Sequence, residues 1–264
     1  MATILDLFRI LDIHTSILFQ FLTTRDACHL RGVCRKLRAF VTDFQWDDRT
    51  LESRVAARLG AVALWRACFP RAITCTLYQG DLKEFKCNYI VEDTDLALLS
   101  GVHYLHIAGC MNVTDVGIAH IGVKYGLREL HINSCNKITD GAFTHLEGIN
   151  ILIMSGCNQS LITDNAFIHL NETCKLIMGG CTQITNEAFV HLKEVRKLGI
   201  SGCPQITDEA FVHLENVEIL NMNRCTQITA KGLTYLHRIK ILFIKGCEIT
   251  EVPEMPDCKI FRAV

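Results

Sequence analysis

Proline is scarce in this sequence, at 4 of 264 residues, and no Gly/Ser-rich or Pro-rich run marks a flexible linker. An excess of one charge is also missing: Lys and Arg total 27, Asp and Glu total 28, and the formal net charge is −1. The chain therefore has no general electrostatic attraction to nucleic acid or to an anionic membrane, and we expect neither as a partner. No stretch of about 18 uncharged apolar residues predicts a membrane span. A hydrophobic content of 49% argues against a disordered chain.

Several signatures of chemistry are absent as well. The chain has no Gly-rich phosphate loop, no His-Glu-x-x-His and no nucleophile elbow, so we expect no intrinsic enzyme activity and no cofactor. No Cys-x-x-Cys occurs among the 14 cysteines, which removes the commonest zinc spacing, and no metal site is expected. Residues 1–9 lack a basic region and carry Asp6, so a signal peptide is not expected and a cytoplasmic and/or nuclear location is favoured.

Half of the cysteines recur at a near-constant spacing. The gaps between them are 25, 22, 24, 22, 22 and 22 residues, and each has Leu five positions before it and Ile or Met three positions before it. A Thr-Asp pair or a close variant follows most of them, and a short helical pattern such as Ala142–Leu146 comes next. These cysteines are Cys110, Cys135, Cys157, Cys181, Cys203, Cys225 and Cys247. Registered copies of this kind indicate a solenoid of repeats.

Each repeat predicts a strand, a turn and a short helix. Leu and Ile two positions apart, such as Leu130 and Ile132, point to the same face of a short strand. The Thr-Asp pair caps the N-terminus of a helix, in which residues three apart, such as Phe143 and Leu146, share one face. One repeat cannot bury its apolar edge alone, so stacked repeats form a parallel sheet with the helices in an outer layer.

This pattern resembles the cysteine-containing leucine-rich repeat, whose Leu-x-x-Leu-x-Leu-x-x-Asn/Cys form is matched by Leu127 through Cys135. The resemblance implies an α/β solenoid with parallel strands on the concave face and short helices on the convex face. It runs from about Val102 to Thr250, with a partial repeat before it at 91–99. Most repeats here are 22 residues apart, somewhat shorter than in many members of that family.

The repeated cysteines and histidines have packing roles in this interpretation. A small side chain with a weak S–H donor suits the ninth repeat position, where the strand turns and the side chain points into the core. Histidine recurs once per repeat beside the helix, and a strand spacing of about 4.8 Å keeps such a column from converging on one metal ion. The column is His120, His145, His169, His191 and His213, continued by Tyr235. The alternative of a reactive, catalytic cysteine applies to Cys28, Cys34, Cys68 or Cys258, which lie outside the repeated series.

Residues 10–46 contain no repeat. Ala27, Leu30, Val33, Cys34 and Leu37 form one stripe of an amphipathic helix. The segment resembles an F-box, although Leu11 stands where that family usually has proline. The residues that carry the resemblance are Leu18-Phe19-Gln20-Phe21-Leu22, Thr24-Arg25-Asp26, the run from Leu30 to Leu37, and Trp46. The alternative is a plain helical cap on the solenoid.

An F-box ahead of cysteine-containing leucine-rich repeats is the arrangement of a known family of ubiquitin-ligase receptors. The resemblance implies a substrate-recognition subunit in the Ubl conjugation pathway, monomeric within a larger complex, that binds a Skp-family adaptor and through it a cullin. It implies a second partner, a protein substrate whose identity the sequence does not give. The implied adaptor-binding residues are Leu11, Leu18, Leu22, Leu30 and Val33. The alternatives are a leucine-rich-repeat scaffold with no ligase link and, least favoured, a cysteine-dependent enzyme.

The chain divides into four predicted segments. These are an F-box-like module at 1–48, a packed linker with a degenerate first repeat at 49–90, the repeats at 91–250, and a C-terminal cap at 251–264. Within the linker, the apolar spacing from Leu51 to Arg66 predicts a helix. Pro253 and Pro256 stop the helical pattern, and the segment from Cys258 to Val264 is expected to add a last strand over the open edge of the sheet.

The candidate partner surface lies on the strands. Residues that alternate with the core Leu and Ile face the concave side, where Ile151, Ile153 and Ile177 cluster. Contiguous apolar residues with a polar rim mark interaction sites. The predicted substrate-binding residues are Tyr104, His106, His131, Ile151, Ile153, Ile177, Lys197, Asn221 and Phe243, flanked also by Lys175. The alternative is that the N-terminal module or the C-terminal tail covers this surface.

Overall fold

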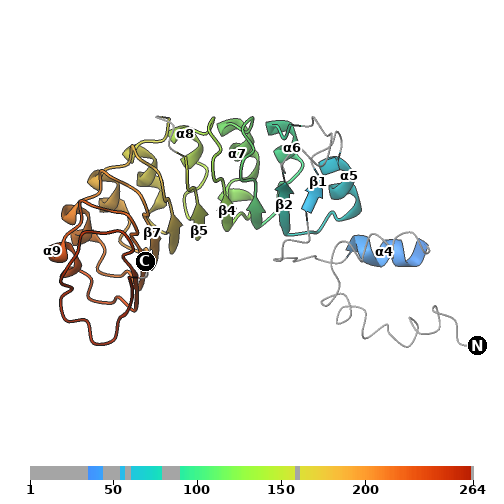
Figure 1. Ribbon diagram of the computed structural model, residues 1–264. Coiled ribbons are helices and arrows are strands. Elements are labelled where there is room, and N and C mark those ends of the chain that lie inside the picture. The colour runs from blue at the N-terminus through green and yellow to red at the C-terminus, as the bar shows by residue number, and fades with distance from the viewer. Residues whose placement is uncertain (1–34, 44–53, 57–60, 79–89, 158–160, 263–264) are drawn as a thin grey trace, which may run out of the picture.

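A computed structural model describes residues 35–43, 54–56, 61–78, 90–157 and 161–262. The chain forms a curved solenoid, in which the strands line the inner side of the arc and the helices its outer side (Figure 1). The described strands form one ten-stranded sheet whose order follows the chain from β1 to β10. This confirms the predicted parallel solenoid with the strands on the concave face and the helices on the convex face.

All neighbouring strands in the sheet pair in parallel, and the repeat leucines stand opposite one another. Leu105 pairs with Leu130, for example, and both side chains are buried. Each such strand is short because the chain turns back toward the outer layer at the cysteine three residues after the core Ile or Met. The strands are β1 (Arg54–Ala56), β2 (Thr74–Tyr78), β3 (Tyr104–His106), β4 (Glu129–His131), β5 (Ile151–Ile153), β6 (Lys175–Ile177), β7 (Lys197–Gly199), β8 (Ile219–Asn221), β9 (Ile241–Phe243) and β10 (Lys259–Phe261).

The outer layer mixes short α-helices with 3₁₀-helices. The 25-residue gap after Cys110 accommodates α7 (Asp115–Ile121) and η1 (Val123–Tyr125), whereas 22-residue gaps contain a single short helix such as η4 (Asp208–His213). A 3₁₀-helix rises about 2.0 Å per residue, so it spans a given length with fewer residues than an α-helix. The other helices are α4 (Arg35–Asp43), α5 (Ala61–Cys68), α6 (Asp93–Ala97), α8 (Asp140–Phe143), η2 (Asp164–Leu170), η3 (Asn186–His191) and α9 (Ala230–Leu233).

The core between the two layers is built from columns of equivalent residues. One phenylalanine per repeat, in each of four successive repeats, is fully buried between the sheet and the helices. The repeat leucines and the Ile or Met residues that follow them close the sheet side. The buried phenylalanines are Phe143, Phe167, Phe189 and Phe211. Because each column continues without a break, every repeat buries the apolar edge of its neighbour.

The predicted helix from Leu51 to Arg66 is wrong at Arg54–Ala56 and confirmed from Ala61 to Arg66. Residues Arg54–Ala56 form β1, and α5 begins only at Ala61. The physical reason is tertiary: β1 pairs in parallel with β2, so segment 49–90 contributes two strands to the sheet and the solenoid begins earlier than the cysteine pattern. The expected C-terminal strand is confirmed, because β10 pairs with β9 and covers its edge.

The N-terminal module lies mostly outside the described residues, including all five implied adaptor-binding positions. Helix α4 is described, and one hydrogen bond links its end to the segment before β2. Val41 is fully buried, and the Arg71 guanidinium donates a hydrogen bond from Nη1 to the Asp43 carbonyl oxygen at 2.8 Å. Within the described part of the chain, no helix is long and apolar enough to cross a membrane.

Candidate protein-binding face

Hydrogen bonds between successive repeats fix the spacing of the strands. The Asp115 carboxylate accepts hydrogen bonds from the Thr139 backbone N–H and hydroxyl at 2.8 and 2.5 Å. The same hydroxyl oxygen accepts from the Gly141 N–H at 3.1 Å, so it also caps α8. Equivalent pairs recur along the solenoid: Asp93 with Thr114, Asp140 with Thr163, Asp164 with Thr185, Asn186 with Thr207, and Asp208 with Thr229. We call this series the Asp–Thr ladder.

The predicted cap is thus confirmed, and the ladder adds a bond between repeats that the sequence reasoning missed. The signal was present: the residue after each capping Thr is Asp or Asn until Ala230, which follows Thr229. Because a carboxylate with two donors makes charge-assisted hydrogen bonds, each such pair ties one helix start to the next.

The repeat cysteines form a second ladder inside the core. The Cys135 thiol donates to the Ile107 carbonyl oxygen of the preceding repeat at 3.2 Å, and Cys181 donates to the Met154 carbonyl oxygen at 3.3 Å. Burial raises the pKa of the Cys135 and Cys181 thiols to about 12. All cysteines in the described residues are free thiols. A buried, protonated thiol bonded to a carbonyl has the properties of a packing residue rather than a nucleophile.

The side chains on either side of each core leucine form two rows across the concave face. Strand register places Ile151 beside Lys175 and Ile153 beside Ile177, so the predicted residues of neighbouring repeats are brought together. The first row reads Tyr104, Glu129, Ile151, Lys175, Lys197, Ile219, Ile241 and Lys259. The second reads His106, His131, Ile153, Ile177, Gly199, Asn221, Phe243 and Phe261.

The apolar centre of the concave face is half-buried. Ile151, Ile153 and Ile177 keep partial exposure because side chains on strands about 4.8 Å apart cover one another. Gly199 is buried, and a Cβ placed on it would lie 2.9 Å from Ile177 Cδ1. The Ile177 side chain therefore lies over Gly199, and the missing side chain of Gly199 leaves room for it.

The N-terminal part of the face is a polar cluster. His131 Nε2 lies 2.7 Å from Glu129 Oε1, and the centroids of the His106 and His131 rings are 4.8 Å apart. Burial, together with the neighbouring His131, lowers the pKa of His106. His106 therefore offers a neutral ring near neutral pH.

The C-terminal part of the face ends in a pair of stacked aromatic rings. Phe243 and Phe261 have ring centroids 4.8 Å apart and an interplanar angle of 16°. Asn221 accepts a hydrogen bond from the Ser201 hydroxyl at 2.7 Å, so this predicted residue is tied to the strand before it. Sequence reasoning did not include Phe261, because β10 has no repeat cysteine that would set its register.

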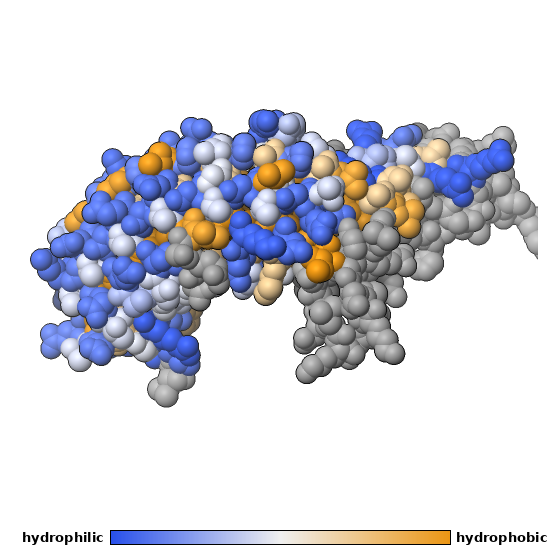
Figure 2. Space-filling model, turned by 90° about the horizontal axis from the view of Figure 1, so that it is seen from above, coloured by the Kyte–Doolittle hydropathy of each residue, from blue (hydrophilic) through white to orange (hydrophobic). Residues whose placement is uncertain are grey.

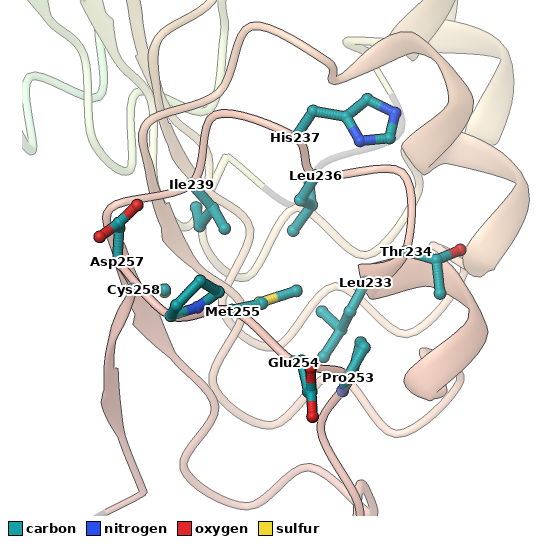
Figure 3. A pocket seen from close by; sticks show the side chains of 11 residues that line it. Leu233, Thr234, Leu236, His237, Ile239, Pro253, Glu254, Met255, Asp257 and Cys258 are labelled. Atoms are coloured by element: carbon teal, nitrogen blue, oxygen red, sulfur yellow. The ribbon is translucent and has the colours of Figure 1, made fainter.

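Two other surface features lie outside the concave rows. Figure 2 looks onto the outer face, which is largely hydrophilic with small apolar patches. One exposed row there consists of Ile168, Val190 and Val212. A pocket of about 430 Å³ lies between α9 and the C-terminal segment, with Leu233, Leu236, Ile239 and Met255 among its lining residues (Figure 3). We interpret this pocket as the packing seam of the C-terminal cap.

The histidine column does not form a metal centre in the structure. His145, His169, His191 and His213 are half-buried beside the helices, and His120 is exposed. Among the described residues, no group of three His, Cys, Asp or Glu side chains is placed to hold a metal ion.

No protein-family model matches the sequence, and no curated protein does either. Solved structures do match by fold. A chain of the TLR13–ssRNA13 complex superposes with a TM-score of 0.59 at 15% identity, over 80% of this protein and 31% of that chain. A chain of the Rad7 and Elc1 complex in yeast superposes with a TM-score of 0.51 at 13% identity, over 97% of this protein and 94% of that chain. The fold of this protein is therefore that of a leucine-rich-repeat solenoid.

Proposed function

We propose that this protein is a non-enzymatic binding scaffold whose concave face holds a partner protein. The observation that carries the proposal is the continuous surface over β3–β9, where a half-buried apolar centre is flanked by polar and charged side chains. Seven strands at about 4.8 Å spacing give a length of about 30 Å, enough for a patch of about 800 Å² per partner. A fixed sheet of this kind is preorganised, because the Asp–Thr ladder holds each repeat before the partner arrives.

We further infer that the scaffold is the substrate receptor of a cullin-type ubiquitin ligase. Support comes from the F-box resemblance of residues 1–48, which the structure does not describe beyond α4. It also comes from the likeness over nearly the whole of both chains to a chain from the Rad7 and Elc1 complex, an assembly of two proteins. The finer assignment to a Skp-family adaptor rests on the resemblance alone.

The attachment of α4 to the solenoid fits this role. The Asp43–Arg71 hydrogen bond links the end of the N-terminal module to the first repeats. A receptor of this design contributes no chemistry of its own. It acts by keeping an adaptor-bound ligase at a fixed distance from a protein on the concave face, so that transfer becomes nearly intramolecular.

Affinity purification of the full chain and of two single-residue variants tests both parts of the proposal. The full chain, with partners identified by mass, is compared with Leu18→Asp in the F-box-like segment and Ile153→Asp at the centre of the concave face. An unpaired charge in a buried contact costs several kcal/mol. We therefore expect Leu18→Asp to lose the adaptor alone and Ile153→Asp to lose the other partner alone.

The matched control is Ile168→Asp, which places the same charge on the exposed outer row. It should retain both partners. If purified adaptor never binds the full chain, the ligase assignment fails and the scaffold remains. If Ile168→Asp rather than Ile153→Asp loses the second partner, the binding face is the convex one.

A further inference from the structure

Two lysines stand directly opposite each other at the middle of the concave face. Lys175 on β6 and Lys197 on β7 are register partners in the parallel sheet. Among the ion pairs of the described residues, none includes either lysine, so no carboxylate lies within 4.0 Å of these ammonium groups. Like charges opposite each other on adjacent strands repel and weaken the pairing. The fold gains nothing from this arrangement, and an anionic group placed between the two lysines would relieve it.

The charged side chains of the concave rows are mostly positive, although the whole chain is close to neutral. Lys259 continues the row of Lys175 and Lys197, and Lys245 lies two residues beyond Phe243 on β9. The one carboxylate in these rows belongs to Glu129, which is already bound to His131. Carboxylates are instead concentrated in the Asp–Thr ladder at the start of the helices. This separation of lysines on the concave face from carboxylates at the helix starts attracts and orients an acidic partner.

Basic side chains also lie at the N-terminal ends of β7 and β9, close to the two lysines. Arg196 and Lys240 both reach Glu218, whose carboxylate oxygens lie 3.9 Å from Arg196 Nη1 and 2.6 Å from Lys240 Nζ. The hydrogen bond and charge of Lys240 lower the pKa of Glu218. This carboxylate is thus occupied by two neighbouring cations and does not neutralise Lys175 or Lys197.

Apolar side chains flank the lysine pair on both sides. Ile151 precedes it and Ile219 follows it in the same row. In the second row, next to the lysine pair, Ile177 lies over Gly199. The surface there is apolar, and no side chain protrudes from position 199. A ligand that satisfies all of these groups needs a negative charge in its middle and large apolar side chains on each side.

We propose that the concave face binds a partner segment in which an Asp or Glu side chain lies between large apolar residues. The carboxylate is placed between the Lys175 and Lys197 ammonium groups, and the apolar residues cover Ile151, Ile153 and Ile219. The proposal rests on the concave face being the partner-binding face, as proposed above.

Selection of twelve-residue peptides from a random display library on the full chain tests this inference. Selected sequences should be enriched in one Asp or Glu between large apolar residues. The strongest peptide is then synthesised with its acidic residue and with the matching amide. We expect the amide form to bind the natural chain at least tenfold more weakly. Lys175→Ala with Lys197→Ala should weaken the acidic form at least tenfold.

Charge reversal gives the decisive control. Lys175→Glu with Lys197→Glu should lose the acidic peptide and bind a version in which its acid is replaced by Lys. Lys193→Glu with Lys231→Glu, the same charge change at exposed positions outside the rows, should bind the acidic peptide unchanged. Thermal unfolding of each variant verifies that the solenoid is intact.

Three results would overturn the proposal. If no peptide is selected, a linear segment is not the ligand. If the selected peptides lack acidic enrichment or ignore both lysines, yet lose binding to Ile153→Asp, the acidic partner is wrong and the concave face stands. If the selected peptides bind the lysine variants and Ile153→Asp as tightly as the natural chain, both the concave binding face and the acidic partner are wrong.

Discussion

The Asp140 carboxylate accepts hydrogen bonds from both the backbone N–H and the hydroxyl of Thr163, at 2.7 and 2.6 Å, and so joins two successive repeats. Thr163 in turn caps η2 by accepting from the Asn165 N–H at 3.2 Å. The Asp140 side chain in the first turn of α8 therefore ties that helix to the N-cap of η2 in the next repeat. Stacked repeats depend on such nearest-neighbour terms for their stability.

The first prediction concerns this pair. Asp140→Ala leaves the Thr163 N–H and hydroxyl without their acceptor and should lower the free energy of unfolding by about 2 kcal/mol, the value of a hydrogen bond to a charged group. Asp140→Asn keeps one acceptor oxygen and should cost less. Urea unfolding followed by circular dichroism measures both. Equal stability of the alanine variant and the natural chain would show that the ladder contributes nothing.

The second prediction uses the natural exception in the ladder. Asn186 accepts from the Thr207 N–H at 3.0 Å and donates from Nδ2 to the Thr207 hydroxyl at 2.8 Å, and Nδ2 also lies 3.3 Å from Glu209 Oε2. Asn186→Asp restores the charged acceptor but places it near Glu209. Combined with Glu209→Gln, it should raise the free energy of unfolding by about 1 kcal/mol. Asn186→Asp alone should gain less, because the two carboxylates repel; an equal gain would contradict this.

The repeat pattern was sufficient to predict the strands from β3 to β9 and the columns of the core. Leu-x-Ile before each cysteine places both apolar side chains on the same face of a strand. The recurrence of this pattern fixes the register between the strands of successive repeats. The helix type was not predictable in this way. Phe143 and Leu146 are three residues apart, and that spacing fits both a 3.0-residue and a 3.6-residue period. Bonds such as the Leu146 N–H to the Phe143 carbonyl oxygen show the tighter i to i−3 pattern in the structure.

Other features depend on tertiary contacts that no local pattern contains. Val55 belongs to a strand because β2 offers a pairing partner, whereas its neighbours in sequence have helical spacing. The row of each concave residue could be predicted, but the half-burial of Ile153 and Ile177 could not. It depends on side-chain direction and on the absence of a side chain at Gly199. The stacking of Phe243 on Phe261 likewise joins a repeat to a segment outside the repeats.

The third prediction tests the contact between Ile177 and Gly199. A Cβ at position 199 would lie 2.9 Å from Ile177 Cδ1, so Gly199→Ala should lower the free energy of unfolding by about 1–3 kcal/mol through overpacking. Ile177→Ala removes the obstructing atoms. In the double variant the cost of Gly199→Ala should largely disappear, which a double-mutant cycle measures. Strict additivity of the two single changes would show that Ile177 does not lie over Gly199 in solution.

The fourth prediction concerns alkaline pH. Burial raises the pKa of the Cys181 thiol from its ordinary value of 9.0 to about 12, so the folded protein keeps its proton at a pH where the unfolded chain loses it. Stability is therefore complete below pH 9.0 and falls as the pH rises from there toward about 12. At pH 10 each such thiol should cost about 1.4 kcal/mol. Urea unfolding at pH 7 and pH 10 should show a smaller loss for Cys181→Ala than for the natural chain; identical losses would assign the pH dependence to other groups.

The last prediction separates the cysteines by accessibility. Cys174 is exposed immediately before Lys175, whereas Cys135, Cys157, Cys181, Cys203 and Cys225 are buried and bonded to carbonyl oxygens of the preceding repeat. A maleimide reagent at pH 7 should therefore label Cys174 first and these core cysteines only after unfolding in urea without reductant. Peptide mapping by mass spectrometry identifies the labelled residues, and Cys174→Ser is the control that should remove the rapidly labelled peptide of this position. Rapid native labelling of the core cysteines would mean that the repeats open locally. Their failure to react after unfolding would mean that they are oxidised, and the thiol-to-carbonyl ladder would then not describe the protein in solution.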